Sequence, residues 1–376
     1  MKIKILAENL ARGLRTVSRT ASLRSTLPVL GNVLMATDEG RLCLTTTNLE
    51  TTTICWIDAL IEQDGAITVP AHTLTDLVST FPPEQVDLEL DSGTQTLNVR
   101  CGGTRTRVKG IEAGEFPPLP EPGPGPAIEI PAADLKELIR KVSVSAASDQ
   151  GRPVLTGVLV AIDGNTITLA AADGFRLSEG VAVLSSPAPK PVQAILPAQA
   201  LDEWVRITGE GEMVAMSFTN SRAVFKTERL WLATQVIEGS FPDYKQIIPA
   251  EWGTRAVLST EAFTRACKRA AIFARENPNS NTVVLNVNGT VEVSGKSDES
   301  GSSRTVIDGE ATTEGEALKI AFNVRYLLDI LKVLDTPNVA IEMSSNTNPG
   351  VIRPVGVEDF LHVVMPLALS GGEGEV

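Results

Sequence analysis

Short runs of alternating apolar and polar residues, separated by turn residues, recur along this chain and predict many β-strands. Between them lie segments in which apolar residues return every three or four positions, as in amphipathic helices. The first such segment, residues 8–24, places Leu10 and Leu14 on one face. Turn signals at residues 38–40 and 164–165 join strand-like runs into hairpins. The pattern predicts an α+β protein whose helices pack on antiparallel sheets.

The predicted elements occur in the same order three times. Each unit has an amphipathic helix, a hairpin, further strands, a second helix and final strands. The second helices of the first two units, near residues 69–78 and 196–205, begin with the same residue order. Phe-Pro connectors at residues 116–117 and 241–242 separate the units, because Pro is excluded from the interior of helices and central strands. We predict three tandem repeats, with two helices each. Their bounds are residues 1–121, 127–249 and 254–369, followed by a flexible acidic tail, 370–376.

The composition is that of a soluble globular protein, with 43% apolar and 21% charged residues. We find neither a run of about 18 apolar residues nor the apolar core of a signal peptide, which predicts a cytoplasmic protein. The four cysteines have no metal-binding spacing, and the chain has only two histidines. We therefore expect reduced thiols, no metal and no cofactor.

The net charge of −13 argues at first against binding to nucleic acid. Nine of the basic residues, however, lie on the predicted first helices of the three units, on the side opposite the apolar stripe. They are Arg12, Arg15 and Arg19 in the first unit, Lys136, Arg140 and Lys141 in the second, and Arg265, Lys268 and Arg269 in the third. If the repeats surround an axis with these helices inward, a basic inner surface would attract a phosphate backbone regardless of sequence.

Catalytic motifs are not found: the sequence has no phosphate-binding loop, nucleophile elbow or zinc-protease motif. Asp163, Asp173 and Glu179 could form a metal cluster, but carboxylates at turns and strand ends are the commoner explanation. An enzyme is the less favoured interpretation. A β-rich hydrolase with a diffuse acidic site stays open as an alternative.

Several short motifs, in a fixed order over the three repeats, resemble the bacterial DNA polymerase III beta subunit, the DNA sliding clamp. The resemblance reaches Leu369 and is carried by residues 26–32, 47–50, 69–71, 172–177, 239–244, 322–326 and 363–366. It implies a head-to-tail homodimeric ring of six domains, with twelve helices around the hole. Such a ring encircles duplex DNA, is placed there by a clamp loader and tethers the polymerase as a non-catalytic processivity factor without a cofactor. A clamp-like paralogue or decoy that binds the same partners is the alternative within this interpretation.

The resemblance also implies three kinds of site. A hydrophobic cleft for partner peptides, from the replicative polymerase alpha subunit, the clamp loader and other proteins with a clamp-binding motif, would comprise Leu155, Ala172, Gly174, Phe175, Arg176, Leu177, Pro242, Ile247, Asn323, Tyr326, Val363, Met365, Pro366 and Leu367. The dimer interface would place Arg105, Thr106, Arg107 and Val108 against Ile272, Phe273, Asp298 and Glu299. Arg24 and Arg152 would join the helix residues in contacting DNA. Phe175, Gln246 and Ala368 differ from well-known members at positions that contact the peptide.

Overall fold

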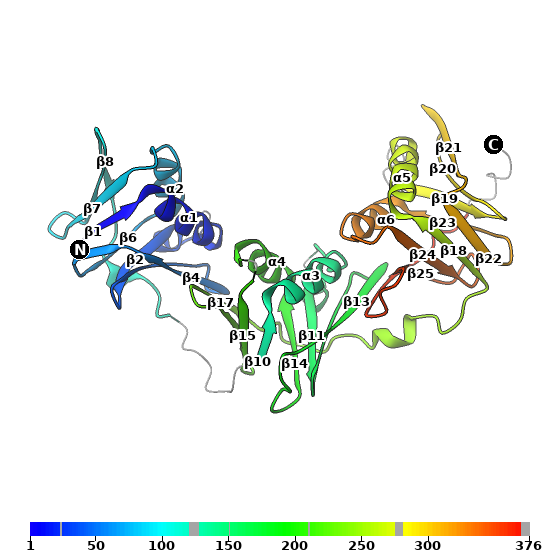
Figure 1. Cartoon of the computed structure of the whole chain (residues 1–376), viewed down its shortest axis with the longest axis horizontal. Coiled ribbons are helices and arrows are strands. Elements are labelled where there is room, and N and C mark those ends of the chain that lie inside the picture. The colour runs from blue at the N-terminus through cyan, green and yellow to red at the C-terminus, as the bar shows by residue number, and fades with distance from the viewer. Residues whose placement is uncertain (23–24, 120–127, 150, 210, 275–280, 370–376) are drawn as a thin grey trace. The chain divides into compact units, whose positions relative to one another are not determined.

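The computed structural model describes residues 1–22, 25–119, 128–149, 151–209, 211–274 and 281–369. The chain forms two compact units (Figure 1). One contains Met1–Ala133 with Arg206–Val236, and the other contains Asp134–Val205 with the chain from Ile237 onward. The boundary between the units therefore divides the second sequence repeat.

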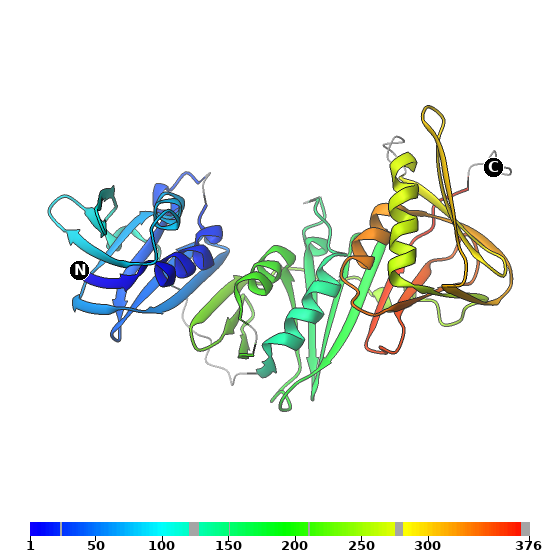
Figure 2. The ribbon, with the colours of Figure 1, turned by 45° about the horizontal axis from the view of Figure 1, so that its top comes forward.

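The first unit has two helices and two antiparallel sheets. Helices α1 (Ala7–Val17) and α2 (Ala71–Ser79) pack side by side (Figure 2). In order across the five-stranded sheet, the strands are β5 (Leu60–Gln63), β1 (Lys2–Leu6), β7 (Gln85–Asp91), β8 (Thr96–Cys101) and β9 (Thr104–Lys109). The eight-stranded sheet contains β10 (Ile128–Pro131), β15 (Met213–Phe218), β16 (Arg222–Lys226), β17 (Leu230–Gln235), β4 (Thr51–Asp58), β3 (Arg41–Thr47), β2 (Asn32–Asp38) and β6 (Ala66–Pro70).

The apolar stripe of α1 explains how this helix packs. Leu10 and Leu14 are fully buried, whereas Arg12 and Arg15 are exposed, as the period of 3.6 residues requires. A Cβ atom on Gly13 would lie 3.0 Å from side-chain atoms of the sheet, so glycine permits the close approach of α1. The α-helix ends at Val17 and continues as one 3-10 turn, earlier than the predicted segment.

The second unit has four helices and two further sheets. The helices are α3 (Ala132–Ser143), α4 (Ala198–Ile207), α5 (Thr260–Ala274) and α6 (Val324–Leu331), and α5 packs against α6. In order, the nine-stranded sheet contains β14 (Val192–Pro197), β11 (Gly157–Asp163), β12 (Thr166–Ala172), β13 (Arg176–Val183), β26 (Phe360–Val364), β25 (Gly350–Pro354), β24 (Asn338–Met343), β18 (Thr254–Ser259) and β22 (Ala311–Gly315). The four-stranded sheet contains β21 (Gly301–Ile307), β20 (Val291–Ser297), β19 (Thr282–Val287) and β23 (Leu318–Asn323).

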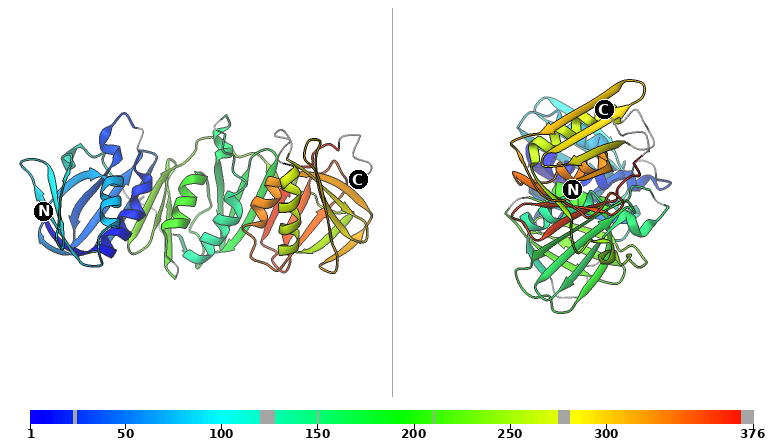
Figure 3. Two further views of the ribbon diagram at one scale, coloured as in Figure 1. Left: turned by 90° about the horizontal axis from the view of Figure 1, so that it is seen from above. Right: turned by 90° about the vertical axis from the view of Figure 1, so that its right-hand side faces the viewer.

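Two of the sheets continue from one sequence repeat into the next. Strand β17 of the second repeat pairs with β4 of the first, from Leu230–Cys55 to Thr234–Thr51. Strand β13 of the second repeat pairs with β26 of the third, as the continuous green and red strands of Figure 3 show. The edges of neighbouring repeats are thus joined by backbone hydrogen bonds, which removes exposed strand edges.

Several predicted elements need correction. Residues 301–307, which include Gly301 and the two serines after it, were not predicted as a strand but form β21. Strands β1, β5, β10 and β22 (Ala311–Gly315) were not predicted, because they are only four or five residues long and the alternation in β1 and β10 is too brief to stand out. Within the described residues, no helix is long and apolar enough to cross a membrane.

Candidate partner-binding surface

The fourteen residues assigned to the peptide cleft all lie in the second unit, and we call them the partner surface. Three large apolar side chains are conspicuously exposed: Phe175 (59%), Ile247 (46%) and Met365 (36%). Leu177 and Val363, by contrast, are almost fully buried and lie beneath the surface. Val363 lies within strand β26. The exposed members are those that could contact a partner directly.

The turn between β12 and β13 presents the exposed aromatic residue. Asp173 Oδ1 accepts hydrogen bonds from the backbone N–H of Phe175 (2.9 Å) and of Arg176 (3.0 Å). Gly174 has φ +94°, a conformation that a residue with a Cβ rarely adopts. Together these features hold the Phe175 side chain outward at a fixed point.

Phe175, Tyr326 and Arg176 form a layered group next to this turn. The rings of Phe175 and Tyr326 are stacked, with centroids 6.5 Å apart and an interplanar angle of 18°. The Arg176 guanidinium carbon lies 4.6 Å from the Tyr326 centroid, in a cation–π contact. Arg176 also forms ion pairs with Asp173 (2.9 Å) and Asp329 (2.7 Å). Burial, with a further effect of the Asp173 charge, raises the pKa of Tyr326, so its phenol is neutral near pH 7.

The segment that follows β26 connects this group to the third repeat. The Met365 N–H donates to the carbonyl of Phe175 (2.8 Å), and the Leu367 N–H donates to that of Ala321 (2.8 Å). The side chain of Asn323 caps helix α6 by accepting a hydrogen bond from the N–H of Arg325 (3.0 Å). Met365 is consequently fixed between the β12–β13 turn and strand β23.

The connector around Pro242 and Ile247 is attached to the sheet through Tyr244. Tyr244 is 6% exposed and packs in a cluster with Leu177 and Val363, the buried members of the partner surface. Its hydroxyl donates to Glu179 Oε2 on β13 (2.5 Å). Burial, reinforced by Glu179, raises the pKa of Tyr244. The connector is thereby held against both repeats that form the nine-stranded sheet.

The three residues that depart from well-known members, Phe175, Gln246 and Ala368, are all exposed. Gln246 Nε2 donates to Asp243 Oδ2 (2.6 Å), and Ala368 is a small exposed side chain. The metal cluster considered from the sequence does not form: Asp173 is bound to Arg176, and Glu179 accepts from Tyr244. Across the part of the chain that the structure describes, no group of three or more His, Cys, Asp or Glu residues could hold a metal ion.

Most of the predicted basic positions are exposed, with two exceptions. The exposed residues are Arg12, Arg15, Arg19, Arg140, Arg152, Arg265, Lys268 and Arg269, whereas Arg24 lies outside the described residues. Lys136 and Lys141 are each only 8% exposed, contrary to the expectation of a solvated face. Lys141 forms an ion pair with Glu137, and its ammonium lies 5.9 Å from the centroid of the Phe360 ring. The helical period predicted which side of α3 faces the sheet of its own repeat. It could not predict that Phe360, from the third repeat, lies next to Lys141.

The predicted interface residues occupy two sheet edges and a helix. The four residues 105–108 lie on β9, at the edge of the five-stranded sheet, with Arg105 and Arg107 exposed. Val108 is 6% exposed, so its side chain belongs to the interior of its own repeat. Ile272 (63% exposed) and the half-buried Phe273 lie on α5, and Asp298 and Glu299 lie in the turn before β21.

Sequence reasoning missed Tyr244, Glu179 and Asp329 as supports of the partner surface. Tyr244 was noticed only as part of a connector, and its pairing with Glu179 joins residues 65 positions apart. The sequence offered one signal, an aromatic residue amid prolines in a segment otherwise suited to solvent.

The fold and surface define a DNA-clamp type of accessory protein built from repeated helix-and-sheet units. The sequence matches all three models of the DNA polymerase III beta subunit: the N-terminal domain over residues 1–120, the central domain over 129–243 and the C-terminal domain over 245–368. The beta sliding clamp of Synechococcus elongatus is 32% identical, over 98% of this chain and 100% of that protein.

Solved structures agree. The sliding clamp of Bacillus subtilis matches with a TM-score of 0.92 and 27% identity, and that of Pseudomonas aeruginosa bound to griselimycin with 0.90 and 27%. Each covers 98% of this chain and 100% of the other. The chain belongs to the bacterial DNA polymerase III beta subunit family, the beta sliding clamps. Its members are non-catalytic processivity factors of DNA replication.

Proposed function

We propose that two copies of this chain form a head-to-tail ring around duplex DNA in the cytoplasm, associated with the nucleoid. The partner surface would bind peptides of the replicative polymerase alpha subunit, the clamp loader and other proteins with a clamp-binding motif. Three domains per chain, at residues 1–121, 127–249 and 254–369, would give six per ring. The family membership supports the tethering role, and the partner surface supports the mode of binding.

The observation that carries the peptide proposal is a group of exposed apolar side chains, Phe175, Ile247 and Met365, with the half-buried Tyr326 stacked on Phe175, in one compact unit. Aromatic and Met side chains supply large contact area and adapt to different partners. Backbone hydrogen bonds and the ion pairs of Arg176 hold the group in place, which lowers the entropic cost of binding.

The pairing of sheet edges within the chain supports the proposal of a ring. Both junctions between repeats within the chain are made by antiparallel pairing of edge strands, β17 with β4 and β13 with β26. Strands β9 and β21 are the edges of the five- and four-stranded sheets. Pairing β9 of one copy with β21 of another would give a nine-stranded sheet, the same size as the largest sheet among the described residues. Arg105 and Arg107 would then approach Asp298 and Glu299, and opposite charges would favour one register.

For DNA, the proposal rests on the exposed arginines and lysines of α1, α3 and α5. Because a net charge of −13 would repel DNA from most of the surface, the clustered basic residues of these helices favour DNA binding there. Lys136 and Lys141 do not contribute to it in the way first expected, because both are buried.

The ring is tested by loading the protein, with a clamp loader, onto nicked circular DNA. We expect retention on the circle and loss after linearisation, because the link is topological. Equal retention on linear DNA would refute it. Sedimentation should give about twice 40.0 kDa, and Arg105→Glu with Arg107→Glu should shift the mass toward the monomer.

The partner surface is tested with a peptide from a replicative polymerase by fluorescence anisotropy. Phe175→Ala with Tyr326→Ala should weaken binding at least tenfold, since two large contacts are removed. Trp252→Ala is a matched control, because Trp252 is a 41% exposed aromatic residue of the same unit outside the surface. Equal effects of both changes would refute the assignment.

A further inference from the structure

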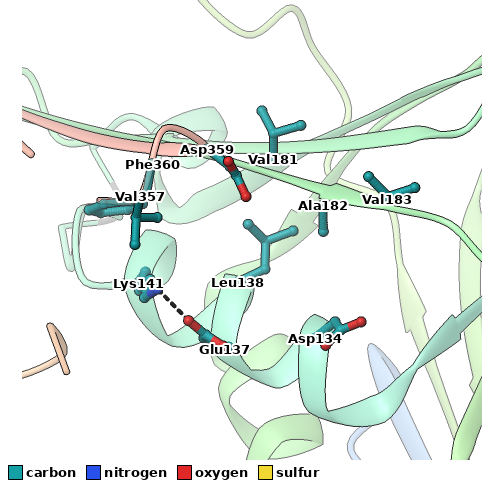
Figure 4. Close-up of a pocket in the computed structure, with 10 residues that line it drawn as sticks. All are labelled: Asp134, Glu137, Leu138, Lys141, Val181, Ala182, Val183, Val357, Asp359 and Phe360. Atoms are coloured by element: carbon teal, nitrogen blue, oxygen red, sulfur yellow. Dashed lines mark hydrogen bonds and ion pairs between the residues drawn. The ribbon is translucent and has the colours of Figure 1, made fainter. Parts of the chain in front are cut away.

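A separate pocket lies at the other end of strand β13. It is a cavity of about 250 Å³ bounded by α3, by residues 181–183 at the end of β13 and by the turn between β25 and β26 (Figure 4). Apolar side chains line it, including Leu138, Val357 and Phe360. Val183 is 69% exposed, the most exposed large apolar side chain of the described residues. We call this cavity the junction pocket, because it lies where the second and third repeats share a sheet.

The rim of the junction pocket is acidic. Asp134 and Glu137 come from α3, and Asp359 comes from the β25–β26 turn. Lys141 is the single basic residue of the lining, and its charge is compensated by Glu137 (Figure 4). Within the described residues, the carboxylates of Asp134 and Asp359 have no ion pair or side-chain hydrogen bond. The pocket therefore combines an apolar lining with two uncompensated negative charges.

The fold does not require acidic residues at this position. The junction between the first two repeats has a corresponding cavity, of about 390 Å³, between α1, the end of β4 and the β16–β17 turn. The backbone correspondence is direct: Trp56 N–H donates to the carbonyl of Arg229 (3.0 Å), as Val181 N–H donates to that of Asp359 (2.8 Å). Arg229 thus stands where the junction pocket has Asp359, and the lining of that cavity has two basic residues, Arg12 and Arg229, and one acidic residue, Glu212. Arg229 also forms an ion pair with Asp58 (2.9 Å). One backbone arrangement supports opposite charges, so the charge is a property of the side chains at each junction.

We propose that the junction pocket is a second docking site for a protein partner, and that it takes an Arg or Lys side chain next to an aliphatic residue. The aliphatic stem and its neighbour would cover Val183 and Val357, while the cationic group meets Asp134 and Asp359. Nucleic acid does not fit, because its phosphates would meet the same carboxylates. This site goes beyond the proposed peptide surface and does not depend on it.

The location permits one partner to contact both sites. Strand β13 runs from Arg176, in the partner surface, to Val183, in the junction pocket. Seven residue steps of a strand correspond to about 23 Å, a distance that roughly seven extended residues can span. A partner anchored at one end would therefore bind the other as a tethered ligand, with increased overall affinity.

The test uses the whole protein with methyl-labelled Val and Leu and two synthetic tripeptides, acetyl-Leu-Arg-Val-amide and acetyl-Leu-Glu-Val-amide. We expect the Arg peptide to shift the methyl signals of Val183 and Val357 saturably at millimolar concentration. The Glu peptide should shift them at least fivefold less at equal concentration. Raising the salt from 50 to 300 mM should weaken the Arg peptide severalfold, because the attraction is electrostatic.

Variants locate the effect. Asp134→Asn with Asp359→Asn should weaken the Arg peptide at least fivefold, and Arg229→Gln in the corresponding cavity should leave it unchanged. Unaltered methyl signals away from the pocket establish that the variants are folded, since both aspartates are exposed. Equal shifts by the two peptides, or binding unaffected by the double change, would overturn the proposal. Neither result bears on the polymerase peptide, whose affinity is measured separately.

Discussion

Removing the hydrogen bond between Tyr244 and Glu179 tests how the connector around Pro242 and Ile247 is held against the sheet. Tyr244→Phe removes the hydroxyl but keeps the ring, whereas Tyr244→Ala removes both. A hydrogen bond to a charged group contributes about 1.5–3 kcal/mol, and the half-buried Glu179 can regain water, so we expect about 1–2 kcal/mol for its loss. Truncating a buried aromatic ring costs about 3–5 kcal/mol.

These two magnitudes predict different outcomes. Losing 1–2 kcal/mol multiplies the population in which the connector is detached by roughly 5–30. If that population is rare in the wild type, it stays a small fraction of the molecules in the variant. Tyr244→Phe should therefore speed hydrogen exchange of the Ile248 amide, which is bonded to Lys245 O, by that factor, with little change in peptide affinity. Tyr244→Ala should lower peptide affinity as well, because the competent fraction falls.

The assays are exchange measured by mass spectrometry or NMR, and peptide anisotropy on the same samples. Glu179→Gln is the matched control, because its amide oxygen still accepts from the phenol and the exchange should stay closer to wild type. If Tyr244→Phe leaves the Ile248 exchange unchanged, the hydrogen bond does not hold the connector. If Tyr244→Ala binds peptide normally, the connector is not part of the partner surface.

Three further predictions concern stability and thiol chemistry. Burial lowers the pKa of His362 to about 3 from 6.5, so the unfolded chain takes up the proton at a higher pH than the folded chain. The free energy of unfolding should therefore fall by about 2 kcal/mol between pH 7 and pH 5. Urea titrations should show this loss in the wild type and not in His362→Leu. Gly315→Ala should destabilise the fold by at least about 3 kcal/mol, because φ is +86° and the new Cβ would lie 1.9 Å from Gly253 O. Gly356→Ala, with φ +82° and open space around the Cβ, should cost only about 1–2 kcal/mol. Similar losses of stability for the two variants in melting experiments would contradict the steric argument. Burial raises the pKa of Cys267, and all four cysteines are buried, so a thiol reagent should react only after urea is added, and rapid native reaction would be the contrary result.

The sequence predicted the features that depend on local pattern. The apolar stripe of the first predicted helix is buried at Leu10 and Leu14 as expected. The exposure of Phe175 agrees with its assignment to a partner surface, although that assignment came from the resemblance and not from periodicity. Local pattern suffices in these cases because a helix or a turn is determined by neighbours within a few residues.

Features that depend on distant neighbours could not be predicted in this way. Lys141 has the spacing of a solvated helix residue, but Phe360, 219 positions later, covers it. The pairing of β13 with β26 is set by which edges meet, and a strand's own pattern does not identify its partner. Tyr244 and Glu179 meet for the same reason.

The shared sheets lead to a last prediction, about which segments unfold together. Strands β15–β17 belong to the second repeat but share a sheet with the first, because β17 pairs with β4. Strands β11–β13 share a sheet with the third repeat, because β13 pairs with β26. Because opening a central strand breaks bonds to both neighbours, we expect the second repeat to exchange in two parts. In rising urea, amides of β16 should become exchangeable together with those of β3, and amides of β12 together with those of β25. If all strands of the second repeat exchanged as one group, distinct from both neighbours, the sequence repeat rather than the shared sheet would be the cooperative unit.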